Sequence, residues 1–222
     1  LAGLMNRYHD RLLWQSADLR SHEGREQVLA RAREMGGVNV LINAAGVNRF
    51  ALFDQIDEQA LDELLDINLK AALQLTRVCL PLLRAQPRAL VVNVGSTYGS
   101  IGYPGYATYC ASKFALRGFS EALRRELADT EMKVLYIAPR ATRTSMNSAQ
   151  VVAMNDALNV AMDDPLEVAD QVAQAIIRER EELYLGWPEK LFVRLNSLLP
   201  RVVDQALRKQ LPIIQRFARN KP

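Results

Sequence analysis

A chain of 222 residues can form one large domain with a complete hydrophobic core, and its 49% hydrophobic and 24% charged residues are typical of globular proteins. The net charge of +3 is unevenly spread, because residues 186–222 hold eight Lys and Arg against two Asp and Glu. No apolar run is as long as a membrane span, and no basic patch is set among aromatic residues, so we expect neither a transmembrane protein nor a nucleic-acid-binding protein.

Cysteine and histidine are too few to suggest a disulfide framework or a metal site. The cysteines are Cys79 and Cys110, and the two histidines, His9 and His22, are scattered. Residues 1–14 show neither the apolar core nor the cleavage site of a signal peptide. We therefore expect a cytoplasmic protein.

Short β-rich runs alternate with longer helical patterns along the chain. The runs predict strands at 12–17, 38–43, 89–95, 132–138 and 182–186. The patterns predict helices at 21–35, 57–84, 108–128 and 165–180, and Pro81 is expected to end or bend the second of them. Buried apolar strands alternating with amphipathic helices are typical of a parallel sheet covered on both faces. The sequence therefore predicts a single α/β domain.

The helix predicted at 108–128 carries Tyr109 and Lys113 just after a segment rich in glycine and proline. Residues four apart share one face of a helix. An ammonium group near a phenol favours the phenolate, so we expect Lys113 to lower the pKa of Tyr109 from about 10 toward neutral pH. Tyr109 would then be a general acid or base. The alternative is an ordinary helix pair with Lys113 in solvent.

Other polar residues fall at the ends of the predicted strands, where parallel sheets bind ligands. Asn43 and Gly46 follow one strand, Ser96 ends the next, and residues 139–144 follow a third. The helix of Tyr109 is entered from the strand that ends at Ser96. These residues are therefore expected to converge on one edge of the sheet, which favours a functional site over an accidental pair.

The order and spacing of these motifs match a known pattern. Ser96 stands thirteen residues before the tyrosine of Tyr-x-x-x-Lys, and Asn68 lies in the long helix predicted at 57–84. Asn-Ala-Ala-Gly occupies 43–46, and Pro-Arg-Ala-Thr-Arg-Thr occupies 139–144. From about residue 18 to 186, the chain resembles the short-chain dehydrogenase/reductase family of single-domain oxidoreductases that use NAD or NADP.

The resemblance implies a Rossmann-type, doubly wound parallel sheet in three α/β/α layers. A partial dinucleotide-binding and catalytic domain would span 1–186, and a basic helical extension over 187–222 would pack on it. The family's glycine-rich phosphate loop and first two strands have no counterpart in the sequence, so we expect an incomplete sequence whose missing part precedes Leu1. In the family's strand order, 12–17 would be the third strand, separated from 38–43 by a gap of about 14 Å.

Four catalytic residues follow from the resemblance. Tyr109 would exchange a proton with the substrate oxygen while the nicotinamide exchanges a hydride. Lys113 would hold the nicotinamide ribose and lower the tyrosine pKa. Ser96 would stabilise the substrate oxygen, and Asn68 would hold a water that connects Lys113 to solvent.

The resemblance also implies contacts with NAD or NADP, and no metal. The expected contact residues are Asp18, Leu19, Asn43, Ala44, Ala45, Gly46, Tyr109, Lys113, Pro139, Arg140, Thr142 and Thr144. Two of them depart from the family pattern, because Ala44 replaces an asparagine and Arg140 replaces a glycine. Arg140 either points outward or, with Arg143, favours an anionic substrate such as an acyl thioester.

Several of these residues have purely structural alternatives. Ser96 would only cap the turn after its strand, and Asn68 would be satisfied within its own helix. Asp18 would be a turn or N-cap residue before the next helix. Cys110 is expected to pack in the core.

The basic tail predicts one or two helices with an apolar face opposite Lys190, Arg194 and Arg201. We expect this tail to cover the substrate cleft or pack on the core, and the alternative is peripheral contact with an anionic membrane. The resemblance also implies a homodimer or homotetramer that pairs through the helices at 57–84 and 108–128.

Taken together, the motifs predict an oxidoreductase that interconverts a secondary alcohol and a ketone, with NAD or NADP and a small-molecule carbonyl or alcohol substrate. One alternative is reduction of a 3-oxoacyl thioester. A second is a redox-silent member of the fold that serves as an interaction or regulatory protein.

Overall fold

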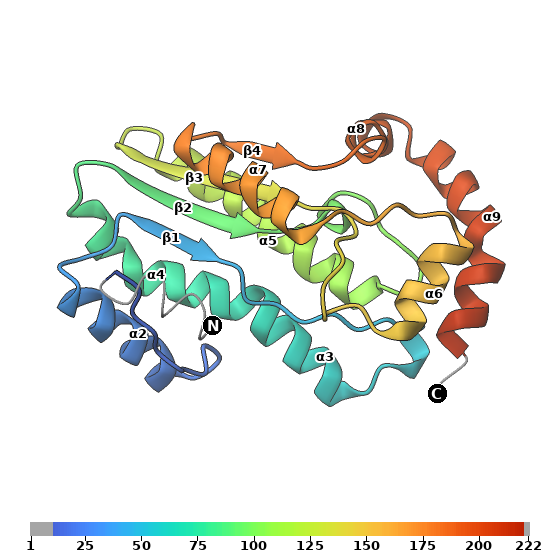
Figure 1. Cartoon of the computed structure of the whole chain (residues 1–222), viewed down its shortest axis with the longest axis horizontal. Helices are drawn as coiled ribbons and strands as arrows, with labels where there is room; N and C mark the ends of the chain where they lie inside the picture. Colours follow the sequence, from blue (N-terminus) through green and yellow to red (C-terminus); the bar gives the residue numbers. More distant parts are fainter. Residues whose placement is uncertain (1–10, 220–222) are drawn as a thin grey trace.

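Four parallel strands form the sheet at the centre of the computed structural model, which describes residues 11–219 (Figure 1). The strands, in their order across the sheet, are β1 (Val40–Asn43), β2 (Ala89–Val94), β3 (Met132–Ala138) and β4 (Glu182–Tyr184). Because every pairing is parallel, all four carboxyl ends meet at one edge, on the right in Figure 1. The four strands predicted from residue 38 onward are confirmed.

Helices occupy most of the remaining chain. They are α2 (His22–Glu34), α3 (Glu58–Leu65), α4 (Ala71–Arg84), α5 (Ala107–Glu126), α6 (Ala149–Ala157), α7 (Pro165–Ile177), α8 (Glu189–Leu198) and α9 (Pro200–Arg219), with short turns η1 (Phe53–Gln55), η2 (Asp66–Lys70) and η3 (Thr97–Gly99). Side-chain caps start several of them. Ser21 Oγ accepts a hydrogen bond from Gly24 N at 2.9 Å, and Asp57 Oδ1 accepts one from Ala60 N at 2.7 Å.

Successive strand residues face two separate hydrophobic cores. Val91 and Val134 pack against α2, α4 and α5, whereas Val92 and Leu135 pack against α7 on the opposite face. All four of these side chains are at most 1% exposed. The sheet therefore lies between two helical layers, as Figure 1 shows, and the α/β/α prediction is confirmed.

The strand predicted at 12–17 is wrong. This segment has no regular structure, and its Leu13 and Trp14 are 48% and 56% exposed. A strand forms only where a neighbour supplies hydrogen bonds, and among residues 11–219 no strand pairs with the outer edge of β1. The predicted gap inside the sheet is therefore not observed, because the described sheet has β1 as its edge.

The helix predicted at 57–84 is a continuous rod of three parts, α3, η2 and α4. The sequence predicts that Pro81 ends or bends the helix, but it lies inside α4, which continues to Arg84, so the helix does not end there. Instead, the α-helical pattern changes at Asp66–Lys70, where one turn adopts the wider π-helical form. Pro81 lacks one N–H group, so α4 loses one backbone hydrogen bond near its end. The rest of the helix keeps its bonds.

The tail forms two helices, α8 and α9, at the carboxyl edge of the sheet, and α9 lies beside α6 (Figure 1). Ile214 of α9 is fully buried in a third core with Val151 and Met154 of α6 and with Tyr106. Within residues 11–219, no helix has the length and apolar character needed to cross a membrane.

Candidate active site

A cleft of about 590 Å³ lies at the carboxyl edge of the sheet. Its lining includes most of the predicted site residues, namely Ala44, Gly46, Ser96, Tyr109, Lys113, Pro139, Arg140, Thr142 and Thr144. The loops after β1, β2 and β3 and the first turns of α5 supply these residues. The predicted convergence on one edge is thus present in the structure.

Ser96 lies two residues after the end of β2, and its hydroxyl lies near both Tyr98 and Tyr109. Its hydroxyl accepts a hydrogen bond from the backbone N–H of Tyr98 at 3.1 Å, which caps the short turn η3. It also lies near the phenol of Tyr109, where it acts to lower the tyrosine pKa. The capping alternative is therefore correct, but Ser96 contacts Tyr109 as well.

Lys113 is buried, with 5% of the residue exposed. Its Nζ donates a hydrogen bond to the carbonyl oxygen of Val94 at 3.0 Å and lies 5.7 Å from the centroid of the Tyr109 ring. Burial disfavours the charged ammonium and lowers the pKa of Lys113 to about 8. The alternative of a solvated lysine is wrong.

The pKa of Tyr109 moves in the direction opposite to the prediction. Burial of the phenol raises it to about 12, although the nearby Ser96 hydroxyl acts the other way. Lys113 does not offset this effect, because its ammonium donates to the carbonyl oxygen of Val94 and not to the phenol. The lysine therefore does not lower the tyrosine pKa in this structure.

Asn68 lies in the π-helical turn η2 and is 1% exposed. Its Oδ1 accepts a hydrogen bond from Val47 N at 2.7 Å, and its Nδ2 donates to Val47 O at 2.9 Å and to Ser112 Oγ at 3.3 Å. Ser112 Oγ in turn donates to the carbonyl oxygen of Tyr109 at 2.8 Å. Asn68 is therefore not satisfied within its own helix but links the loop after β1 to α5.

In the loop after β1, the backbone of Gly46 passes close to Asn68 and Lys113. A Cβ atom at this position would lie 3.3 Å from Asn68 Oδ1 and 3.8 Å from Lys113 Nζ. A side chain would therefore crowd the cleft beside Lys113. Its backbone is left open toward the cleft instead.

Asn43, by contrast, does not line the cleft. It is buried, and its Nδ2 donates to Asn93 Oδ1 of β2 at 2.8 Å and to Thr76 Oγ1 of α4 at 2.9 Å. Asn93 Nδ2 donates to Ser120 Oγ of α5 at 2.9 Å. Asn43 is thus part of a buried polar row inside the sheet.

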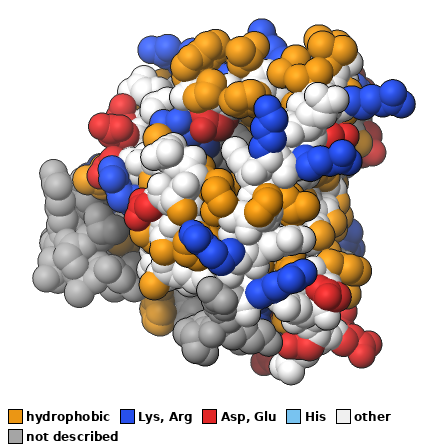
Figure 2. Space-filling model, turned by 90° about the vertical axis from the view of Figure 1, so that its right-hand side faces the viewer, with side chains coloured by type: hydrophobic (Ala, Val, Ile, Leu, Met, Phe, Trp, Pro, Cys, Tyr) orange, Lys and Arg blue, Asp and Glu red, His pale blue; other side chains and the backbone are white. Residues whose placement is uncertain are grey.

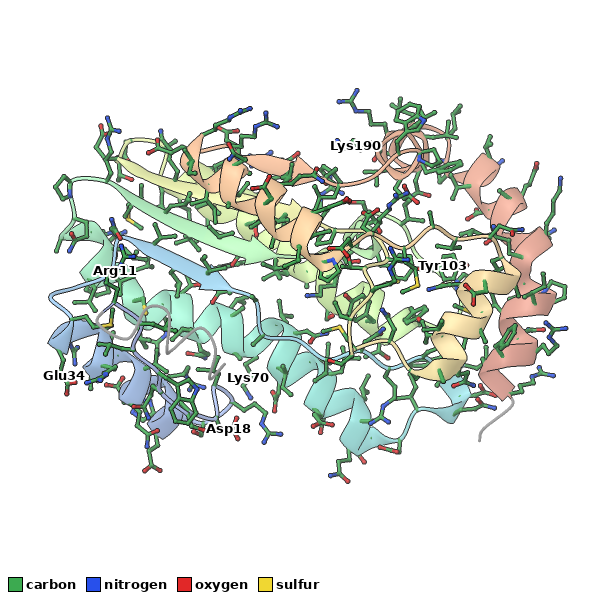
Figure 3. The ribbon with its side chains drawn as sticks, in the orientation of Figure 1. Arg11, Asp18, Glu34, Lys70, Tyr103 and Lys190 are labelled. Carbon is green, nitrogen blue, oxygen red and sulfur yellow. The ribbon has the colours of Figure 1, made fainter. Side chains whose placement is uncertain are left out.

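Three more of the expected cofactor-contact residues, Asp18, Leu19 and Ala45, also lie away from the cleft. Leu19 and Ala45 line a separate small depression next to α4. Asp18 is exposed and forms an ion pair with Arg20 at 2.8 Å, and hydrogen bonds from Arg20 hold the pKa of Asp18 below its usual range. Ser21, not Asp18, caps α2. Figure 3 shows Asp18 beside α2 and Tyr103 near α6, in different parts of the molecule.

Arg140 is held by two carboxylates. Its NH2 lies 2.6 Å from Asp163 Oδ1, and its NH1 lies 3.0 Å from Glu189 Oε2. The hydrogen bonds that Arg140 donates to Asp163 raise the pKa of Arg140 above its ordinary value. The guanidinium therefore neither points freely into solvent nor presents an unpaired charge to an anionic substrate.

An aromatic wall was missed at the sequence level. Tyr98 and Tyr103 stack with their ring centroids 4.9 Å apart, and Tyr106 lies 5.3 Å from Tyr98. The phenol of Tyr103 donates to Gln210 Oε1 of α9 at 3.2 Å. All of these residues line the cleft. The clustering of tyrosines between residues 98 and 109 was the available signal.

The tail supplies the remaining wall. Lining residues from α8 and α9 include Phe192, Leu195, Val202, Val203, Ala206 and Leu207. Together with Tyr98 and Tyr106, they give the cleft a predominantly apolar lining on the side away from Lys113. No short motif marks these residues, because their position depends on how the two helices pack.

Comparisons with known proteins agree with this geometry. The short chain dehydrogenase family profile matches residues 2–155. Nodulation protein G of Rhizobium meliloti (strain 1021) is 34% identical over 113 residues, which cover 51% of this chain and 46% of that protein. The 3-oxoacyl-[acyl-carrier-protein] reductase of Bos taurus is 38% identical over 114 residues, covering 51% and 48%. The chain thus spans about half the length of the curated relatives it matches.

Similarity to solved structures extends further. A short-chain dehydrogenase from Streptomyces avermitilis superposes with a TM-score of 0.78 at 28% identity, over 94% of this chain and 84% of that one. The match therefore includes most of the region beyond residue 155. The family profile, the similar structures and the Ser96, Tyr109 and Lys113 arrangement all agree, and the chain belongs to the short-chain dehydrogenase family.

Proposed function

We propose that the protein is an NAD- or NADP-dependent oxidoreductase that interconverts a secondary alcohol and a ketone, with Tyr109 as general acid and base. The observation that supports this function is the single cleft lined by Ser96, Tyr109 and Lys113, with the Ser96 hydroxyl near the Tyr109 phenol. Membership of the family adds support, since its members use these cofactors.

The residues around Lys113 fit the nicotinamide half of such a cofactor. Among residues 11–219, the ammonium uses one of its three N–H donors, on Val94 O, which leaves donors for ribose hydroxyls. Gly46 leaves the space beside Lys113 open, and Pro139 and Thr142 line the same cleft. When bound, the nicotinamide supplies or accepts the hydride.

The side chains of the protein, and not the cofactor, carry out the proton transfer. With a pKa of about 12, Tyr109 keeps its proton at neutral pH and is ready to donate it to a carbonyl oxygen. The hydroxyl of Ser96 can donate a second hydrogen bond to the same oxygen and stabilise its developing charge. In the direction of oxidation, Tyr109 would receive the proton of the alcohol.

The apolar walls of the cleft support a substrate with a lipid-like substituent. A second candidate is reduction of a 3-oxoacyl thioester, favoured by relatives named 3-oxoacyl-[acyl-carrier-protein] reductase. Phe114, exposed on α5, supports the further proposal of a homodimer or homotetramer that pairs through α4 and α5. We place the protein in the cytoplasm.

Turnover of NADH and NADPH with an apolar ketone and with a 3-oxoacyl thioester tests the proposal. Tyr109→Phe should lower kcat by a factor of about 10² to 10⁴ while leaving the Kd for the cofactor within about twofold. Tyr184→Phe is the matched control, because Tyr184 bonds Ser100 and does not line the cleft. Full activity of Tyr109→Phe would contradict the proposed role.

A further inference from the structure

The corner where α8 meets α9 exposes large apolar side chains. Trp187 and Leu191 are 69% and 50% exposed, and Leu198 and Leu199 are 79% and 54% exposed. Figure 2 shows hydrophobic side chains gathered along the upper edge of this face of the molecule, with Lys and Arg side chains around them. A contiguous exposed apolar patch of this kind marks a binding surface.

Basic residues surround this corner, which we call the α8–α9 corner (residues 187–202). On α8, Arg194 lies between Leu191 and Leu198 in an i, i+3, i+7 stripe, so the three side chains share one exposed face. On α9, Arg201 and Arg208 lie seven residues apart on one exposed face, and Arg216 and Arg219 continue this line toward the end of the helix. Figure 3 places Lys190 at the outer edge of α8.

The charge of this region is strongly one-sided. Residues 187–219 hold seven Lys and Arg, all exposed, against only Glu189 and Asp204. Glu189 is paired with Arg140, so it does not neutralise the corner. Among residues 11–219, no carboxylate forms an ion pair with Lys190, Arg194 or Arg201.

We propose that the α8–α9 corner docks onto the surface of an anionic lipid bilayer. Leucine and tryptophan side chains would enter the headgroup region, while the surrounding Lys and Arg contact lipid phosphates. Each basic residue near such a surface strengthens the attraction to it. The combination of aliphatic side chains and unpaired positive charge fits this partner in both its apolar and its charged layers.

A second copy of the chain fits the surface less well. In a twofold interface the same patch meets itself, and the positive charges of Arg194 and Arg201 would be brought toward those of the second copy. Like charges brought together in this way oppose association. An acidic lipid surface has the opposite charge and needs no complementary shape.

The cleft opens at the same place. Phe192 and Val202 both line the cleft and are 42% and 49% exposed at the corner. A bilayer bound at the corner would therefore lie at the mouth of the cleft. Docking itself requires neither cofactor nor turnover, so it can fail or succeed independently of the proposed oxidoreductase activity.

Co-sedimentation with vesicles tests the docking. The protein should bind vesicles of phosphatidylcholine mixed with phosphatidylglycerol, bind vesicles of phosphatidylcholine alone at least about tenfold more weakly, and be released by salt. The double variant Leu198→Asp/Leu199→Asp should lose at least about tenfold in affinity for the anionic vesicles. Neither leucine lines the cleft.

Ile177→Asp is the matched control, because Ile177 is 73% exposed but lies at the far end of α7, away from the corner (Figure 1). It should bind anionic vesicles as the unchanged protein does. Thermal unfolding and elution volume show whether each variant keeps its fold and assembly. Equal binding to both lipid compositions, equal loss in the control, or self-association abolished by Leu198→Asp/Leu199→Asp would overturn the proposal.

Discussion

The ammonium of Lys113 lies 5.7 Å from the centroid of the Tyr109 ring, yet it donates its hydrogen bond to the carbonyl oxygen of Val94 at 3.0 Å. The two side chains therefore share burial without a direct hydrogen bond. Burial moves the pKa of Lys113 down to about 8 and that of Tyr109 up to about 12. At a pH between these two pKa values, both side chains are mostly uncharged.

Lys113 makes the stability of the protein depend on pH. Its pKa falls from 10.5 to about 8 on folding, so between these values the unfolded chain binds more protons than the folded one. The free energy of unfolding should therefore rise with pH across this window, by about 3 kcal/mol in total. Urea unfolding at a series of pH values measures this rise.

Lys113→Met separates this contribution from others in the same range. Burial raises the pKa of the Cys79 and Cys110 thiols, which lowers stability as pH increases past their ordinary values. Both thiols remain in the variant, and the difference between the two proteins isolates the lysine. If that difference stays constant from about pH 8 to 10, the buried lysine does not titrate as stated.

Asn68 satisfies both backbone groups of Val47, and an apolar replacement should expose that dependence. Asn68→Leu leaves the N–H and C=O groups of Val47 without this partner, which should reduce the free energy of unfolding by about 2–4 kcal/mol. Chemical denaturation measures the loss. A change below about 1 kcal/mol would mean that other groups replace the amide.

Asn68→Asp is a more selective version of the same test. A carboxylate accepts from Val47 N but repels Val47 O, whereas the protonated acid can donate to that oxygen. The carboxyl group should therefore have a raised pKa in the folded state. Relative to the unchanged protein, this variant should gain stability as pH falls through that pKa, and a loss on acidification would refute the assignment.

A side chain at position 95 would occupy the same space as the ring of Tyr136. A Cβ atom at Gly95 would lie 2.2 Å from the phenol oxygen of Tyr136. Gly95→Ala should therefore destabilise the protein by about 1–3 kcal/mol, through overpacking. In the double variant Gly95→Ala/Tyr136→Val the two losses should be less than additive by at least about 1 kcal/mol, and strict additivity in urea unfolding would rule out the clash.

Arg140 should contribute to the free energy of unfolding and not to the preference for an anionic substrate. Arg140→Ala leaves Asp163 and Glu189 facing each other without a cation, and the free energy of unfolding should fall by about 1–3 kcal/mol. Arg140→Lys should recover only part, because an ammonium cannot match the forked contacts with both carboxylates. The ratio of kcat/KM for thioester and ketone substrates should not change in Arg140→Ala.

Local patterns predicted the sheet well from residue 38 onward. The apolar runs that contain Val91 and Leu135 are long enough to be buried on both faces, so they read as strands without knowledge of their neighbours. The run at 12–17 has a similar local pattern. It failed because a strand depends on a partner, which no local pattern describes.

Tertiary effects account for what the sequence could not predict at the site. Spacing placed Tyr109 and Lys113 on one helix face, but the direction of each pKa shift depends on burial by residues distant in sequence. The π-helical turn at Asn68 similarly accompanies hydrogen bonds to Val47, on another segment. The apolar wall from α8 and α9 depends on helix packing, which motif spacing does not encode.

The polar row inside the sheet also determines which strand alignment can fold. Asn43 and Asn93 are direct partners in the β1–β2 ladder, and Thr76 and Ser120 approach them from helices. A slip of one residue would place each amide beside a valine or isoleucine with no hydrogen-bond partner. Each amide that loses its partner would cost about 1–3 kcal/mol. The two asparagines therefore fix the register of strands that apolar packing alone would allow to slide.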